Sequence, residues 1–202
     1  MLTEIFICPI PTSANVFYTL FVCVLVPVYW RHYGPANFLW FSDIALLIGL
    51  AALWLESPLL SSMQAVSVLL LELLWSAEFL IRLTIGKPIF GLVEYMFKSN
   101  IPLWLRGLSL FHLALPPLLI WLVYCFGYDG RALIAQTILL WVVVPVCFFF
   151  TEPAENINWV FGFGERPQKT LPPWLYVALL LVGVPIGIYL PTHFLLDALL
   201  AK

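Results

Sequence analysis

The chain has 202 residues, of which 63% are apolar and 10% charged, with a mean hydropathy of +1.01 and a formal net charge of −2. Soluble domains average about 45–50% apolar and about 25% charged residues, and a water-soluble fold of this size could not bury so much apolar surface. The composition therefore excludes soluble enzymes and disordered scaffolds. The small net charge also excludes nucleic acid as a partner, because it leaves no basic face for phosphates.

Hydropathy along the chain predicts an all-α integral membrane protein, with six membrane-spanning helices in one domain that covers residues 1–202. A helix crosses a bilayer with about 20 residues, so six crossings use roughly 120 residues and leave short loops. Helices are expected because lipid offers an open sheet no hydrogen-bond partners. The predicted spans are 13–30, 37–56, 62–85, 102–126, 132–150 and 172–200.

Basic residues are divided unevenly between the two predicted sides of this bundle. The side that holds the loops after spans 1, 3 and 5 carries Arg31, Arg82, Lys87, Lys98, Arg106, Arg166 and Lys169. The side that holds both termini carries only Arg131 and Lys202. Because cytoplasmic loops are enriched in Lys and Arg, we expect a multi-pass protein with both termini on the non-cytoplasmic side.

The segment 86–100, between the third and fourth spans, is predicted to form a short amphipathic helix in the cytoplasmic interface. Glu94 and Lys98 would form an i,i+4 ion pair on such a helix. Its apolar face would consist of Phe90, Val93, Met96 and Phe97. A plain amphipathic connector with no partner is the simpler alternative.

The four cysteines show no CxxC pair and no metal-ligand spacing with histidine. Cys23 and Cys147 lie inside apolar runs and are expected to be packing residues. Cys8 and Cys125 fall on the same predicted side of the membrane, where a disulfide between them is conceivable but not expected.

Ionisable residues inside the predicted spans are the main functional candidates, because each costs a few kcal/mol in a bilayer. Asp43, with Ser42 beside it, lies about two turns into the second span, and His112 lies about ten residues into the fourth. The carboxylates expected near them are Glu72, Glu78 and Glu155. We therefore expect a polar cluster in the cytoplasmic half of the bundle.

A proline kink is expected directly after the intramembrane histidine. Pro116 has no N–H, so the carbonyl of His112 loses its usual i+4 partner, and Pro117 does the same to Leu113. Freed carbonyls must face protein or a water-filled cavity rather than lipid. The kink therefore favours a polar cavity beside His112.

Simpler structural roles are open for several of these residues. Glu78 and Arg82 could form an i,i+4 ion pair at a helix end, and His193 and Asp197 could form another at the outer surface. Glu152 and Glu155 could lie in the interface in contact with water. Asp43 and His112 could make a purely structural polar contact.

Three chemistries could use such a cluster. Ser42 could act as a nucleophile with His112 as its base and with Asp43 or Glu78 orienting the imidazole. A carboxylate-rich metal site could instead recruit His112 together with Asp43, Glu72, Glu78 or Glu155. The same carboxylates could relay protons along a transport pathway.

Two stretches of the chain resemble a known family of membrane enzymes. One runs Ile101-Pro102-Leu103-Trp104-Leu105, then reaches His112 and Leu115-Pro116-Pro117, and the other runs from His32-Tyr33-Gly34-Pro35 to Trp40-Phe41-Ser42. They look similar to parts of the androgen-induced and androgen-dependent transmembrane proteins. That family consists of six-span intramembrane threonine hydrolases of fatty-acid esters of hydroxy fatty acids, and a related acyltransferase branch is known. The resemblance implies that Ser42, where the family has a threonine, is the nucleophile and His112 its base.

The sequence thus predicts an intramembrane hydrolase or acyltransferase that acts on membrane lipid esters and needs no cofactor. The main alternative is a non-enzymatic membrane subunit or small-ligand binder, whose buried polar residues hold together the bundle, a homo-oligomer or a membrane protein partner. A metal-dependent membrane enzyme is the third hypothesis.

Overall fold

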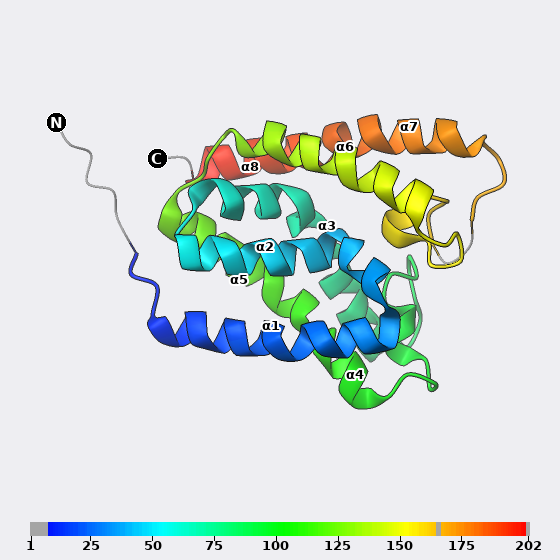
Figure 1. Ribbon diagram of the computed structural model, residues 1–202, viewed down its shortest axis with the longest axis horizontal. Coiled ribbons are helices and arrows are strands. Elements are labelled where there is room, and N and C mark those ends of the chain that lie inside the picture. Colours follow the sequence, from blue (N-terminus) through cyan, green and yellow to red (C-terminus); the bar gives the residue numbers. More distant parts are fainter. Residues whose placement is uncertain (1–7, 165–166, 201–202) are drawn as a thin grey trace.

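The computed structural model describes residues 8–164 and 167–200, and this part of the chain is helical with no β-strand (Figure 1). The α-helices are α1 (Thr12–Tyr33), α2 (Phe41–Leu55), α3 (Pro58–Ile85), α4 (Leu103–Leu108), α5 (Phe111–Phe126), α6 (Ala132–Phe150), α7 (Pro173–Val184) and α8 (Leu190–Leu200). Short 3₁₀ segments are η1 (Pro35–Leu39), η2 (Glu94–Phe97) and η3 (Ile157–Trp159), and a π-helical turn, η4 (Pro185–Tyr189), joins α7 to α8.

The helices run back and forth between two ends of an elongated bundle. The start of α1, the end of α8 and the connections α2–α3 and α5–α6 lie at one end, on the left of Figure 1. The connections α1–α2 and α6–α7 lie at the opposite end. The arrangement separates the chain connections in the alternating manner expected of a multi-pass helical bundle.

Local sequence explains where α3 begins and ends. The Ser57 hydroxyl accepts a hydrogen bond from the backbone N–H of Leu60, and Pro58 occupies the first turn, where a missing N–H costs nothing. At the other end, Gly86 takes φ +76°, a left-handed conformation in which glycine avoids a Cβ penalty.

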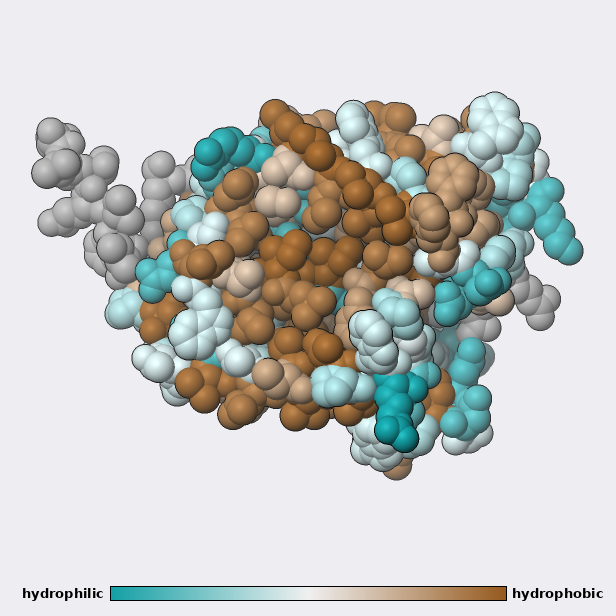
Figure 2. Space-filling model, viewed as in Figure 1, coloured by the Kyte–Doolittle hydropathy of each residue, from teal (hydrophilic) through white to brown (hydrophobic). Residues whose placement is uncertain are grey.

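The helix α3 is the centre of the bundle and packs against α2, α5, α6 and α8. Its buried residues include polar side chains that would be costly in lipid, among them Gln64, Glu72 and Glu78. Apolar side chains instead cover the outside, and Phe17, Leu103 and Phe150 are 74%, 76% and 82% exposed. Figure 2 shows an apolar belt across the middle of one face, with hydrophilic residues towards the ends.

In the described part of the chain, four helical segments are long and apolar enough to cross a membrane. They are Thr12–Tyr33, Leu103–Phe126, Ala132–Phe150 and Pro173–Leu200. The protein is therefore an all-helical, multi-pass membrane protein. The other two predicted spans correspond to α2, which is shorter than a full crossing, and to the central helix α3.

The helix α5 (Phe111–Phe126) continues through Pro116 and Pro117, and the break in this span comes earlier. The helices α4 and α5 meet at Ser109 and Leu110, before His112 rather than after it. The carbonyl oxygen of His112, which Pro116 deprives of its usual partner, accepts a 3.4 Å hydrogen bond from the Ser76 hydroxyl of α3. The freed carbonyl thus faces protein, as the bilayer requires.

The prediction of an amphipathic helix over 86–100 is wrong. Only Glu94–Phe97 forms a single 3₁₀ turn, and the rest of this segment is irregular. Val93 and Met96 are buried as expected, but Phe90 is 52% exposed. The segment folds around a carboxylate of α3, described below, whose bonds to consecutive amides are incompatible with a regular helix.

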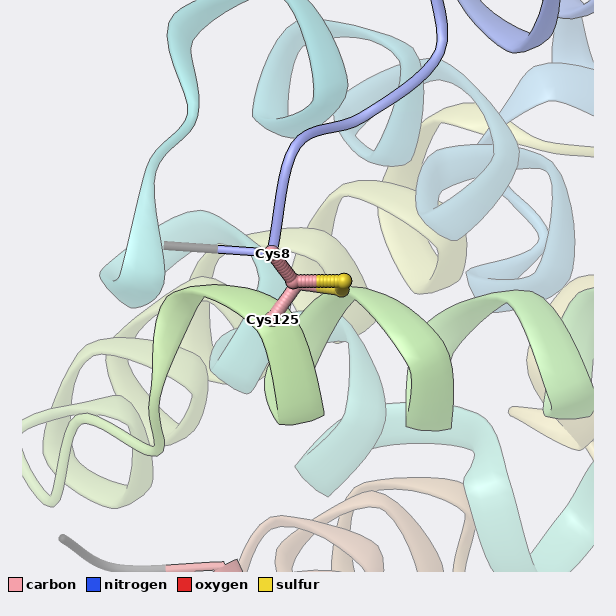
Figure 3. The surroundings of a disulfide bond; sticks show 2 residues. All are labelled: Cys8 and Cys125. Atoms are coloured by element: carbon pink, nitrogen blue, oxygen red, sulfur yellow. A yellow bond between two sulfur atoms is a disulfide. The ribbon is translucent and has the colours of Figure 1, made fainter. Parts of the chain in front are cut away.

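The cysteines also differ from expectation. Cys8 and Cys125 form a disulfide that ties the segment before α1 to the last turn of α5 (Figure 3). Cys147 is buried as expected, whereas Cys23 is exposed on the outside of α1. Helix packing brings residues 8 and 125 together, and the sequence carries no signal for that approach.

Candidate functional site

A hydrogen-bonded pair of ionisable side chains lies between the central helix and α5. Glu72 Oε2 accepts a 2.8 Å hydrogen bond from His112 Nδ1, and the two side chains are 5% and 14% exposed. Donation from Nδ1 leaves the other ring nitrogen, Nε2, as an acceptor. Among residues 8–164 and 167–200, Nε2 has no hydrogen-bond partner.

Aromatic rings fix the orientation of this histidine. The imidazole stacks on Trp75 and Phe111, with ring centroids 4.6 Å and 4.2 Å apart. Trp75 lies one turn after Glu72 on α3, so the same helix supplies both the hydrogen-bond partner and one stacking ring. A ring held on its faces and at Nδ1 can present only Nε2 to a reacting group.

Asp43 is the second carboxylate of the site. It lies in the first turn of α2 and is 4% exposed. Its Oδ2 accepts a 3.3 Å hydrogen bond from Asn37 Nδ2, and its Oδ1 is buried without a partner in the described structure. Asp43 is close enough to His112 and Glu72 to interact with both electrostatically. Of the predicted residues, Glu72 and His112 therefore bond directly, and Asp43 lies near both.

A cluster of hydroxyl groups lies beside this carboxylate–histidine site. The hydroxyls of Tyr29 and Ser109 are 2.7 Å apart, and Tyr95 also hydrogen-bonds Ser109. Burial holds the pKa of Tyr95 well above its usual range, so its hydroxyl stays protonated. Sequence reasoning missed Ser109, although its position one helical turn before His112 could have suggested it.

Ser42, the predicted nucleophile, lies beside Asp43 in the first turn of α2 and is partly exposed. In the described part of the chain, no hydrogen bond joins Ser42 to His112, whose Nδ1 is bonded to Glu72 instead. Glu72 therefore holds the histidine, a role that the sequence had assigned to Asp43 or Glu78.

Glu78 has a different role from the predicted one. Its Oε1 accepts hydrogen bonds from the backbone N–H groups of residues 89, 90 and 91 at 3.2, 3.0 and 2.7 Å, and its Oε2 accepts one from residue 92 at 3.2 Å. The suggested partner Arg82 instead lies 3.6 Å from Glu94 and donates to the carbonyl of Gly86. Glu78 thus organises the connection between α3 and α4 and does not orient His112.

An open cavity of about 320 Å³ lies at the end of the bundle where α1 ends. Its lining residues come from α1, η1 and the segment after α6: His32, Tyr33, Asn37, Trp40, Glu155 and Ile157. Asn37 both lines this cavity and binds Asp43, so one side chain connects the cavity with the buried site. Glu155, proposed above as a metal ligand, belongs to the cavity wall.

The segment after α6 has an unusual backbone. Asn156, Asn158 and Trp159 take φ angles of 45°, 52° and 55° in the left-handed region, which is rare for a bulky residue such as tryptophan. Asn158 holds the segment against η1, because its side chain accepts from the N–H of Phe41 and donates to the carbonyl of Leu39. Strain of this kind persists where the surroundings fix it, often at functional sites.

The remaining expectations concern metal and the outer end of the bundle. Within residues 8–164 and 167–200, no group of three His, Cys, Asp or Glu side chains could hold a metal ion. His193 does not pair with Asp197; its Nδ1 lies 2.6 Å from the hydroxyl of Tyr128.

Searches for similar proteins found no match among protein-family models, curated proteins or solved structures.

Proposed function

We propose that this protein is an intramembrane enzyme that hydrolyses or transfers the acyl group of membrane lipid esters, with His112 as its general base. The observation that carries the proposal is the 2.8 Å bond between His112 Nδ1 and Glu72 Oε2. A carboxylate bonded to one ring nitrogen fixes the tautomer and stabilises the imidazolium that forms when the other nitrogen takes a proton. The stacking of the ring on Trp75 and Phe111 adds the rigidity that such a base requires.

The proposed reaction begins at a hydroxyl group. Ser42 gives its proton to His112 Nε2 as its oxygen bonds to the acyl carbon, and the ester C–O bond then breaks. His112 returns the proton to the departing alkoxide. Water or a second lipid hydroxyl then gives a proton to His112 as its oxygen bonds to the acyl carbon, the bond from the acyl carbon to the Ser42 oxygen breaks, and His112 returns the proton to that oxygen. Ser109 is the second candidate nucleophile, because its hydroxyl already belongs to the buried cluster.

We further propose six crossings with both termini outside the cytoplasm. The helices α2 and α3 would supply the two additional crossings, since α3 packs against other helices and buries its polar side chains Gln64, Glu72 and Glu78 there, while apolar side chains of α3 such as Leu80 and Leu83 are exposed. The Cys8–Cys125 disulfide supports this orientation, because disulfides persist in oxidising compartments and this one lies at the end of the bundle opposite most basic residues. Lipid substrate would then enter from the cytoplasmic leaflet.

Labelling of the detergent-purified protein with a fluorophosphonate probe tests the proposed enzyme. Wild-type protein should be labelled, and Ser42→Ala, His112→Ala and Glu72→Gln should each abolish or strongly slow labelling while the fold is kept. Loss of labelling in Ser109→Ala alone would transfer the nucleophile to Ser109. No labelling of the folded wild-type protein would refute a serine enzyme.

A non-enzymatic membrane subunit is the second candidate function. It is favoured by other buried polar pairs that join helices with no reactive group, such as Gln136 and Ser67 at 2.9 Å and Tyr18 with the carbonyl of Leu46 at 2.7 Å. If the Glu72–His112 pair is of this kind, His112→Ala should lower the thermal unfolding midpoint, because Glu72 would be left buried and unpaired. Labelling would then be absent in every variant.

A further inference from the structure

We propose that the cavity at the end of α1 binds the ammonium head group of a zwitterionic phospholipid. The cavity, of about 320 Å³, lies at the lower end of the range of small-ligand sites, about 300–1,000 Å³. It can therefore hold a head group but not two acyl chains. It also lies where the membrane-crossing helix α1 ends, which is the depth at which lipid head groups lie.

The charge of the cavity selects a cation. The Glu155 carboxylate is in the wall and has no hydrogen-bond or ion-pair partner in the described structure. Behind the wall, Asn37 leads to Asp43, whose Oδ1 is buried and unpartnered. Glu155 is the one acidic residue described as lining the cavity, and no Lys or Arg is among the lining residues, so Glu155 supplies the negative charge of the wall.

Aromatic side chains favour an alkylated ammonium group over a metal ion. Tyr33 and Trp40 both line the cavity, and aromatic rings bind quaternary ammonium groups through cation–π attraction. Trp40 packs edge-on against Trp159 at a centroid distance of 6.0 Å, and Tyr33 packs edge-on against Tyr29 at 5.2 Å. These ring contacts restrict the motion of Tyr33 and Trp40, which lowers the ordering cost of binding.

The backbone strain after α6 has a use in this arrangement. The left-handed conformations of Asn156 and Asn158 directly follow Glu155, and the side-chain bonds of Asn158 to η1 hold the two cavity walls together. The structure thus stores strain where it positions the only carboxylate among the residues described as lining the cavity. Binding of the head group is independent of the proposed function. Only the further step, that the bound lipid is the substrate, rests on the proposed function.

Calorimetric titration of the purified full chain with dihexanoylphosphatidylcholine tests the proposal. Because Glu155 is exposed, we expect Glu155→Gln to weaken binding about fivefold, as for loss of an exposed charge pair, and Tyr33→Leu to weaken it to a similar extent. The matched control Glu152→Gln removes an exposed carboxylate outside the cavity and should leave binding unchanged. Dihexanoylphosphatidylglycerol, which has no ammonium group, should not bind, and dihexanoylphosphatidylethanolamine should bind more weakly than the choline lipid.

Equal binding of the glycerol and choline lipids, or equal effects of Glu152→Gln and Glu155→Gln, would overturn the proposal. The unfolding midpoint of Glu155→Gln shows whether the variant is folded, and Tyr33→Leu gives a second, independent variant. Fluorophosphonate labelling separates this inference from the proposed enzyme. Choline-lipid binding without labelling would leave the cavity site standing and refute the enzyme, and labelling without binding would do the reverse.

Discussion

Replacing Glu72 by glutamine separates a catalytic histidine from a structural one. Glutamine has nearly the shape of glutamate and retains an oxygen that can accept the 2.8 Å bond from His112 Nδ1. It removes the negative charge that would stabilise the imidazolium. A neutral bond replaces a charge-assisted one, so we expect the free energy of unfolding to fall by only about 1–2 kcal/mol.

The effect on catalysis should be much larger than the effect on stability. General-base catalysis contributes about 10²–10⁴-fold, and most of that depends on the charge and the orientation that Glu72 supplies. We therefore expect the rate of fluorophosphonate labelling to fall by about 10²-fold or more, which corresponds to about 2.7 kcal/mol or more of activation free energy.

The assay is a time course of labelling together with thermal unfolding of the same preparation in the same detergent. Glu152→Gln, a neutralised exposed carboxylate far along the chain from α3, is the control for detergent and charge effects. A labelling rate within about threefold of wild type, well under 1 kcal/mol, would refute the role of Glu72 as the orienting group of a catalytic base.

Three further predictions concern the scaffold. Glu78→Ala removes the acceptor of four backbone hydrogen bonds. Because water can reach part of the exposed segment, we expect the free energy of unfolding to fall by about 2–4 kcal/mol and hydrogen exchange over 86–97 to become faster. Unchanged exchange would contradict the role of Glu78. Cys125→Ser should lower the free energy of unfolding by about 4 kcal/mol, since the disulfide closes a sequence separation of 117 residues. The same variant should expose Cys8 to a membrane-impermeant maleimide added outside the cell. Labelling of Cys8 only after the membrane is opened would reverse the proposed orientation. Burial raises the pKa of Tyr128 to about 12. The stability that depends on its protonated form is therefore complete below pH 10 and is lost as the pH rises from 10 to about 12. Tyr128→Phe should flatten this part of the stability profile, and an unchanged alkaline profile in this variant would contradict the prediction.

The choice of carboxylate shows the limit of what the sequence could predict about the site. The sequence placed Asp43, Glu72, Glu78 and His112 in one half of the bundle, because ionisable residues in apolar spans stand out by their cost in lipid. Glu72 and Glu78 are six residues apart, which rotates their side chains by roughly 240° around α3. Only the packing of α5 against α3 decides that Glu72 faces His112 and that Glu78 faces the following loop.

The prediction of a helix over 86–100 was wrong for a related reason. Its apolar spacing fits a helix, but local pattern contains no information about a buried acceptor on a neighbouring element. The Glu78 carboxylate accepts hydrogen bonds from the backbone N–H groups of residues 89–92, which a helix would bond internally. Charge-assisted bonds of this kind are stronger than the helical bonds that they replace.

Composition and hydropathy by themselves determined the membrane class and the all-helical architecture. The reason is that lipid offers backbone N–H and C=O groups no hydrogen-bond partners, so each apolar segment bonds its own backbone as a helix. Tertiary structure decided which side chains meet: the disulfide of Cys8 and Cys125, the pairing of Glu72 with His112, and the cavity around Glu155. Each of these contacts joins residues far apart in the chain, and their approach depends on helix rotation and packing that no local sequence pattern records.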